Sequence, residues 1–371
     1  MEAQLSPGQL ARRRFFRYRP AWFGLFYLGL CLFISLFGYW LAPDKTTHAN
    51  FQVLELAKQA PGSQGFLLLL PGPEVEQGSW WSVLWNGEKA QFVPLAIQSF
   101  ETIELGKEYV RFIHLSGAQD SLPLTRFHLG KKQELTRQGF LEAFTRQITF
   151  HLGSDAYGRD LLSRILLGTR VSLFVGLMSV LISLSLGIFL GTLAGYFGGW
   201  VDRSIMWLIS VLWSIPTLLL ALALAAVLGR GFWQLFVAIG ASMWVEVARL
   251  VRGQILALRE QPFVEAAQAL GYPSGRIMWT HILPNITSPI IVIAVANFGA
   301  AVLIESGLSF LGLGVEVPIP TWGRMVNEGY TFLVFEAGQW LAIYPGLALV
   351  LLIVSVNLIG IGLRDALDVK N

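Results

Sequence analysis

The chain has 371 residues, of which 54% are hydrophobic and 14% are charged, and its formal net charge is +3. A soluble globular chain carries about 25% charged residues, so this composition excludes the soluble class and indicates a membrane protein. The small net charge gives no reason to expect a nucleic-acid partner. The single cysteine, Cys31, excludes an intrachain disulfide and a cysteine-based metal or redox site.

The first apolar segment, Ala21–Ala42, carries no charge. It is longer than the roughly 7–15 residues of a signal-peptide core and matches the roughly 20 residues that cross a bilayer. We therefore predict an uncleaved transmembrane anchor over residues 22–42. The arginines before it place residues 1–21 in the cytoplasm by the positive-inside rule.

Residues 43–152 separate this anchor from the next apolar segment, and we predict that they form a small extracytoplasmic domain of mixed structure. Segments bounded by Pro, Gly and Asn turns predict strands at Gly65–Leu70, Trp81–Trp85 and Tyr109–Leu115. Arg126–Ile148 has a helical pattern. An irregular excursion packed on the membrane core remains the alternative.

Five further apolar segments follow and predict an all-α membrane core of six transmembrane helices. Pro216 and Pro345 fall inside two of them, which neighbouring helices can tolerate. An even number of spans returns the C-terminus to the side of the N-terminus. The arginines of the short loops agree with that parity, so we expect both termini in the cytoplasm. The five segments are Val171–Phe197, Ile205–Leu228, Gly231–Ala248, Ile286–Gly312 and Ala337–Leu363.

The loop over residues 249–285, between the fourth and fifth spans, carries the most informative pattern. It is mostly helix-forming and is interrupted at Gly271–Gly275, where Pro273 disfavours a helical conformation for the residue before it. We therefore predict a helix, a glycine turn and a second helix on the cytoplasmic face.

This loop resembles the Glu-Ala-Ala-x-x-x-Gly signature of binding-protein-dependent ABC importer permeases. The signature favours isoleucine where this chain has His281, and the sequence His-Ile-Leu-Pro-Asn resembles the version in the peptide importer branch. A chance Glu-Ala-Ala in an ordinary amphipathic loop is the alternative, but the register of the whole pattern favours the signature. The matching residues are Glu265, Ala266, Ala267, Gly271 and Pro284.

Other segments resemble dipeptide and oligopeptide permeases of the permease C type. Gly153–Arg170 is similar to the segment before their second span, and Leu308–Gly314 with Pro320–Gly323 to the segment after their fifth. Gly195–Asp202 also fits. The resemblance covers the anchor and the chain from Gly153 onward, but not the insert.

The resemblance implies a type I ABC importer permease fold over residues 153–371 and ATP-driven import of di- or oligopeptides without a cofactor. It implies four kinds of partner besides lipid: a second homologous permease, two cytoplasmic ATPases, an extracytoplasmic binding protein and a peptide substrate. The chain would lie in the inner membrane. It contains no Gly-x-x-x-x-Gly-Lys-Ser/Thr nucleotide loop, so we assign ATP hydrolysis to the partners and do not expect an enzyme.

In this family's mechanism the loop couples the permease to an ATPase. Ala266 and Ala267 would allow a close approach, Gly271 would permit the sharp turn, and Glu265 would pair with a basic group or cap a helix of the ATPase. Import of nickel, opines or another small solute is an alternative with the same architecture. A membrane-anchored interaction protein without transport is an alternative of another class.

Two glutamates fall near the ends of predicted spans. Glu305, in the fifth span, could line the cargo pathway, because an ionisable group at membrane depth is a functional hypothesis; a bond to backbone or to Arg324 at the boundary is an equal alternative. We interpret Glu246 as a structural partner of Arg249 or Arg252.

Four charged residues before the second span fall at helical spacing, which predicts oppositely charged partners on one helix face that fix the outer loop to the span ends. They are Asp155, Arg159, Asp160 and Arg164. The five histidines show no ligand spacing, so we expect no metal site.

Overall fold

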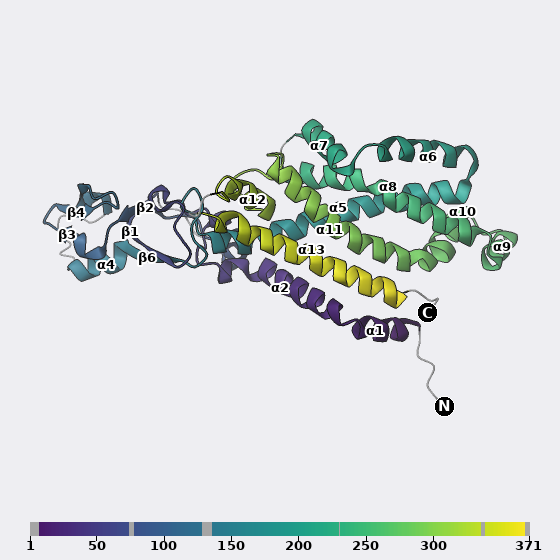
Figure 1. Ribbon diagram of the computed structural model, residues 1–371, viewed down its shortest axis with the longest axis horizontal. Helices are drawn as coiled ribbons and strands as arrows, with labels where there is room; N and C mark the ends of the chain where they lie inside the picture. The colour runs from purple at the N-terminus through teal and green to yellow at the C-terminus, as the bar shows by residue number, and fades with distance from the viewer. Residues whose placement is uncertain (1–6, 74–77, 128–135, 230, 335–337, 368–371) are drawn as a thin grey trace, which may run out of the picture. The chain divides into compact units, whose positions relative to one another are not determined.

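A computed structural model describes residues 7–73, 78–127, 136–229, 231–334 and 338–367. The chain divides into two compact units (Figure 1). The helical unit comprises Met1–Leu32, Val171–Glu316 and Ala348–Asn371, and the sheet unit comprises Phe33–Arg170 and Val317–Leu347.

Among the described residues, five helical segments are long and apolar enough to cross a membrane, and a bent pair of helices makes a sixth candidate. This confirms the prediction of a helical membrane core. The five are α2 (Arg19–Leu41), α5 (Leu161–Phe197), α8 (Phe232–Arg259), the continuous segment Ser274–Phe310 and α13 (Trp340–Leu367). The bent pair is α6 (Gly199–Trp213) with α7 (Thr217–Leu228). Helix α1 (Pro7–Arg17) precedes them.

The third span, predicted at Ile205–Leu228 with Pro216 inside it, is a bent pair of helices. Helices α6 and α7 meet at 94°. Pro216 causes this bend, because it has no N–H to donate and its ring would clash with the carbonyl of Leu212 one turn earlier. The N–H of Ile215 instead donates to Leu212 O at 3.1 Å, and Pro216 starts α7.

Helix α8 is longer than the fourth span we predicted, because it continues past Ala248 to Arg259. Val247, Val251 and Ile255 are all buried and repeat every four residues, which keeps one apolar face on the core beyond the expected end.

The segment Ser274–Phe310 likewise begins before Ile286 and comprises α10 (Ser274–Arg276), a π-helix (Ile277–Ile282), a 3₁₀ turn (Leu283–Ile286) and α11 (Thr287–Phe310). Ala337, the expected start of the sixth span, lies outside the described residues.

Glycines spaced four residues apart bring α5 and α8 together. A Cβ added at Gly187 would collide with Val247, at Gly191 it would lie 2.6 Å from Ala248 O, and at Gly195 it would lie 2.9 Å from Ile255 Cβ. Small residues at this spacing allow two membrane helices to approach closely. The contact fixes α8 on α5 along several turns.

The sheet unit contains two antiparallel sheets of three strands each, with orders β2-β1-β6 and β3-β4-β5. In the first, Phe66 pairs with Ile97 and Gly65 pairs with Ile148. These sheets and their short helices confirm a small domain of mixed structure. The strands are β1 (Ser63–Pro71), β2 (Phe92–Ile97), β3 (Glu104–Leu105), β4 (Tyr109–Ile113), β5 (Gln119–Pro123) and β6 (Thr145–Phe150), and the helices are α3 (Trp80–Asn86), α4 (Arg137–Phe144) and α12 (Trp322–Tyr330).

Strands β1 and β4 occupy the segments predicted around Gly65–Leu70 and Tyr109–Leu115, but the strand predicted at Trp81–Trp85 is wrong. That segment is helix α3, which ends where Gly87, at φ 77°, donates its N–H to Val83 O at 2.9 Å. Aromatic residues suggested a strand, and the terminating glycine was the signal for a helix.

The helix predicted over Arg126–Ile148 is confirmed only over Arg137–Phe144 and is wrong for the rest of its described length. A 3₁₀ turn covers Leu124–Phe127, residues 128–135 lie outside the described chain, and α4 extends only to Phe144. The β-branched residues that follow form β6 instead, because pairing with β1 overrides local helix preference.

Candidate functional site

The loop that carries the signature holds a short helix, α9 (Pro262–Ala269), between the ends of α8 and α10. In Figure 1, α9 and α10 lie at the same end of the helical unit as α1 and the end of α13. Gln261 precedes α9, and Pro262 occupies the first turn, where its missing N–H costs nothing. The arrangement is the predicted helix, turn and helix.

Helix α9 is fixed on the chain's own core by one face. Val264 is 0% exposed and Ala267 is 4% exposed, and both belong to a buried apolar cluster. The other members of this cluster are Val247, Val251, Ile255, Ile277, Ile282 and Ile286, from α8 and from the segment after the turn. Apolar burial therefore holds α9 in a defined position.

The opposite face of α9 is exposed. It carries Glu265 and Ala266, two of the residues we predicted at the ATPase contact. Large apolar side chains flank them, with Phe263 42% and Leu270 73% exposed. Ala267, expected at the same contact, instead faces the interior, where its small size lets α9 lie close to the core.

Gly271 ends α9 in a left-handed conformation with φ +74°. Its N–H donates to Gln268 O at 2.9 Å, and the N–H of Tyr272 donates to Ala267 O at 3.2 Å. These two bonds form a Schellman motif, in which glycine is favoured because it has no Cβ. The signature glycine therefore has a conformational role that the structure makes explicit.

The turn after Gly271 is closed by stacked rings. The centroids of Tyr272 and His281 lie 6.0 Å apart with an interplanar angle of 8°. The guanidinium of Arg276 lies 5.4 Å from the Tyr272 centroid. His281, the residue that departs from the general signature, is thus a packing partner of Tyr272.

Pro284 is exposed and starts the 3₁₀ turn Leu283–Ile286. Because it has no N–H, the helix before it cannot continue its regular bonds, and Leu283 donates to Met278 O in a π-type bond. Pro284 therefore shapes the entry into α11.

Polar contacts tie this end of α8 to its neighbours. Arg252 donates from Nε to Asp202 Oδ1 at 2.5 Å and from Nη2 to Oδ2 at 2.6 Å, a bidentate pair. Arg259 Nη1 donates to Tyr196 O at 3.2 Å. These contacts join α8 to α5 and α6 beside the loop.

The two glutamates of the spans have opposite environments. Glu305 is 0% exposed, and Ser309 Oγ donates to its Oε1 at 2.7 Å. Glu246 is exposed on α8. Our interpretation of Glu246 as a partner of Arg249 or Arg252 is wrong, because Arg252 pairs with Asp202 and Arg249 lies 3.5 Å from the Trp213 ring centroid.

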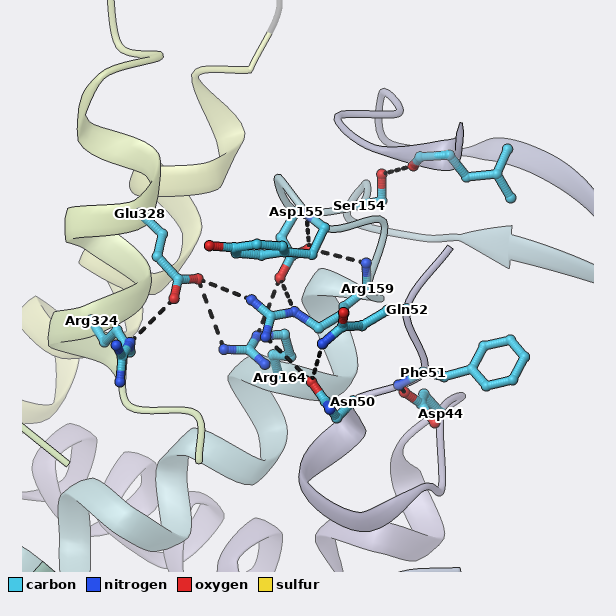
Figure 2. Close-up of polar contacts among 12 residues, drawn as sticks. Asp44, Asn50, Phe51, Gln52, Ser154, Asp155, Arg159, Arg164, Arg324 and Glu328 are labelled. Atoms are coloured by element: carbon cyan, nitrogen blue, oxygen red, sulfur yellow. Dashed lines mark hydrogen bonds and ion pairs between the residues drawn. The ribbon is translucent and has the colours of Figure 1, made fainter. Parts of the chain in front are cut away.

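A second polar cluster lies in the sheet unit (Figure 2). Arg159 Nε donates to Asp155 Oδ2 at 2.6 Å, and its Nη2 donates to Glu328 Oε2 at 3.2 Å. Glu328, on α12, also accepts from Arg324 at 3.2 Å. Arg164 is fully buried, 3.4 Å from Asp155 Oδ2 and 3.9 Å from Glu328 Oε2. The cluster joins the start of α5 to α12.

Helical spacing was the wrong explanation for part of this cluster, because α5 begins only at Leu161. Asp155 and Arg159 belong to a tight turn, in which Asp155 N donates to Arg159 O at 2.9 Å. Gly158, at φ +71°, permits this turn and leaves no space for a Cβ beside Val53 O. Asp160 closes the turn by a bridge to Ser154.

Asp160 stands apart from the ion pairs. Ser163 donates to its Oδ2 from the backbone N–H at 2.8 Å and from Oγ at 2.5 Å, while its Oδ1 is buried without a hydrogen bond. Burial raises the pKa of this carboxyl above its usual range, and the bonds from Ser163 offset this only in part.

Sequence reasoning missed several features of these sites. The repeat of Gly187, Gly191 and Gly195 was a visible signal for close packing of α5. Glu246 had the same signal as Glu305, an acid within an apolar segment, but nearby arginines suggested a false partner. The role of Glu328 had no local signal, because its partners lie far away in the chain.

Comparisons with known proteins match this chain to transport permeases. The family described as binding-protein-dependent transport system inner membrane component matches residues 187–370, and the N-terminal TM domain of oligopeptide transport permease C matches residues 6–61. Residues 62–186 lie outside both matches.

The chain matches most of the length of two curated relatives. The dipeptide transport system permease protein DppC of Alkalihalophilus pseudofirmus is 42% identical over 59% of this chain and 71% of its own. The glutathione transport system permease protein GsiD of Pectobacterium atrosepticum is 44% identical over 59% of this chain and 72% of its own. Among solved structures, a chain of the inward-facing MetNI methionine ABC transporter aligns at 19% identity over 56% of this chain and 96% of that chain, with a TM-score of 0.45.

With its apolar helices, its signature loop and these matches, the chain belongs to the family of binding-protein-dependent transport system inner membrane components.

Proposed function

We propose that this chain is a permease subunit of an ATP-driven importer of di- or oligopeptides, and that α9 is the element on which an ATPase docks. The observation that carries the proposal is the division of α9 into two faces. One face packs on a buried cluster that includes α8, and the other exposes Glu265 and Ala266 beside Phe263 and Leu270.

This division suits the transmission of force. A docked subunit can move the spans only if the docking helix is held firmly against them. Burial of Val264 and Ala267 holds α9 in this way. The exposed apolar side chains would supply contact area, and Glu265 would supply a charge for a basic partner group. Gly271 would fix the direction in which α9 projects, and Pro284 would orient α11 behind it.

The proposal extends to topology and domain organisation. We place the loop, residues 1–21 and the C-terminus in the cytoplasm and residues 43–152 outside, with the permease core over residues 153–371. The arginine distribution supports this, as does the position of α1 and the end of α13 at the same end of the helical unit as α9 (Figure 1). The partners would be a homologous permease, two ATPases and an extracytoplasmic binding protein.

Peptide cargo is supported by relatives described as dipeptide and glutathione permeases. Nickel, opines and other small solutes remain the alternatives, and uptake of labelled dipeptide against nickel would separate them. Glu305 could take part in the pathway only in a conformation that exposes it, because it is fully enclosed here.

The decisive experiment is co-purification of the detergent-solubilised chain with its partners. We expect an ATPase and a second permease to accompany the intact chain, and the ATPase alone to be lost from the double variant Glu265→Lys, Gly271→Pro. Glu260→Lys is the matched control, because Glu260 is an exposed acid just before α9. Absence of an ATPase from every preparation would refute the docking role and favour a membrane-anchored interaction protein.

A further inference from the structure

Glu246 places a carboxylate midway along α8, a candidate membrane span, two residues before the end of its apolar part. It lies 14 residues after Phe232, the start of α8, which is about 21 Å along the helix at 1.5 Å per residue. Its neighbours Val245 and Val247 are buried, whereas Glu246 is exposed. A charge at membrane depth faces lipid only at a high cost, so its surroundings in the assembled protein have to be polar.

Among the described residues, the arginines near this carboxylate contact other groups. Asp202 and the Trp213 ring engage the two nearby arginines, and Glu246 forms no hydrogen bond or ion pair within the described part of the chain. Within the described part of the chain, this carboxylate is therefore open to a ligand or to a partner subunit.

A cavity of about 130 Å³ adjoins the carboxylate. It lies at the α6–α7 bend and is bounded by α8 and α11, with apolar walls such as Leu212, Met243 and Ile304. Thr217 and Ser242 add hydroxyl groups, and Glu246 is the only charged residue among the described residues of the lining. An acid in the lining of a small, mostly apolar cavity is suited to a ligand with a cationic group next to a side chain.

We propose that Glu246 and this cavity form a cargo subsite in which the carboxylate binds the α-ammonium of a peptide and the cavity receives the side chain of the first residue. Pockets for whole small molecules measure roughly 300–1,000 Å³, so this cavity fits one side chain rather than a peptide. An ammonium–carboxylate bond is charge-assisted and directional. The inference rests on the proposed function and names the cargo group that this permease recognises.

The transport test uses the complete transporter in proteoliposomes with its binding protein. Leucyl-alanine and N-acetyl-leucyl-alanine are each supplied at a concentration that saturates the binding protein. We expect Glu246→Gln to reduce uptake of the free peptide at least tenfold and of the acetylated peptide less than twofold, with Glu246→Asp restoring much of the difference. Equal loss for both peptides, or no loss, would overturn the proposal.

A second variant tests the cavity without touching the acid. Ala300 lines the cavity and is exposed, so Ala300→Leu adds bulk there without disturbing buried packing. We expect it to reduce uptake of leucyl-alanine several-fold more than uptake of glycyl-alanine. An equal effect on the two dipeptides would mean that the cavity does not receive the first side chain.

Thiol labelling gives a readout that does not need transport. Cys31 is the only cysteine, so Cys31→Ser provides a cysteine-free background for Glu246→Cys. A charged methanethiosulfonate reagent should label position 246 in the assembled complex and leave Glu305→Cys, a fully enclosed control, unlabelled. Leucyl-alanine should slow labelling at least threefold.

These outcomes separate this inference from the proposed function. Failure of the intact transporter to import any peptide rejects the peptide cargo itself. Import by the intact transporter, together with a Glu246→Cys variant that is not labelled or not protected by peptide, rejects only the subsite. Loss of the second permease from Glu246→Gln on co-purification would assign the carboxylate to a subunit contact and also overturn the subsite.

Discussion

Tyr272 and His281 lie face to face across the turn between α9 and α10, with centroids 6.0 Å apart and planes 8° from parallel. The contact links the last residue of the Schellman motif to the π-helix that precedes Pro284. It explains why a histidine can stand where the general signature favours isoleucine, since its flat ring closes the turn.

The double-mutant cycle of Tyr272→Ala and His281→Ile tests this contact. Aromatic pairs contribute about 0.5–1.5 kcal/mol beyond the area they bury, and the low end applies here because Tyr272 is 39% exposed. We expect a coupling free energy of about 0.5 kcal/mol and faster amide exchange over residues 270–283 in each single variant. Additive effects would show that the rings do not stabilise the turn.

Gly271→Ala isolates the conformational role of the signature glycine. A Cβ there meets nothing within 4 Å, so the substitution costs only the left-handed conformation, about 1–2 kcal/mol. We expect a lower midpoint of thermal unfolding and weaker ATPase co-purification. Gly253→Ala is the matched control, because that glycine is helical, also has open space, and should be neutral or stabilising.

Gly191→Val tests the close contact of α5 and α8. The added side chain would meet Ala248 O and Val251, and overpacking of this kind costs about 1–3 kcal/mol or more. Thermal unfolding in detergent should shift downward strongly. Gly29→Val on α2, where a Cβ meets nothing within 4 Å, should shift it far less, and equal shifts would contradict the packing argument.

Arg159→Met tests the buried ion pairs of the sheet unit. It removes the bonds to Asp155 and Glu328. Breaking a buried pair from one side costs at most about 3–5 kcal/mol here, because Arg164 and Arg324 still face these carboxylates. Arg324→Met removes a partly exposed pair with the same Glu328 and should cost less than about 1 kcal/mol. Chemical unfolding curves of the two variants give the comparison, and similar costs would contradict it.

Asp160 predicts a pH dependence of a definite sign. Because burial raises its pKa above 3.8 in the folded state, the folded chain binds this proton more tightly than the unfolded chain. The contribution of Asp160 to stability therefore falls as pH rises from 3.8 through the folded pKa. We expect Asp160→Asn, which stays neutral, to gain stability relative to the parent across that window, and a difference independent of pH would refute the assignment.

The apolar segments and the signature loop were predictable because both depend on local sequence. Apolar length placed the spans, and the turn at Gly271 follows from backbone preference. The bend at Pro216 was not predicted, because a proline inside a span either kinks or is accommodated according to its neighbours. The segment that forms β6 was predicted wrongly for a related reason, because its pairing with β1 decides its conformation. The segment that forms α3 was predicted wrongly because the helix-terminating Gly87 was overlooked.

The candidate site residues were likewise only partly predictable from the sequence. Glu265 and Ala266 lie on the exposed face where the signature implied a contact, but only the structure distinguishes them from the buried Ala267. The partner of Arg252 is Asp202, 50 positions away, so Glu246 was assigned a nearby partner that it does not have. Proximity in the sequence suggested the wrong pairing of Glu246 with an arginine. The fold instead brings Asp202 to Arg252.

Helix α8 runs without interruption from Phe232 to Arg259, and its last turns share a buried cluster with α9. Helix α8 is about 42 Å long, and in the proposed mechanism it would act as a lever, with the loop at one end and Glu246 partway along it. A rotation transmitted from the loop to α8 would turn the carboxylate with the helix. Such a lever would let the hydrolysis cycle of a distant ATPase present the acid to its ligand and then withdraw it.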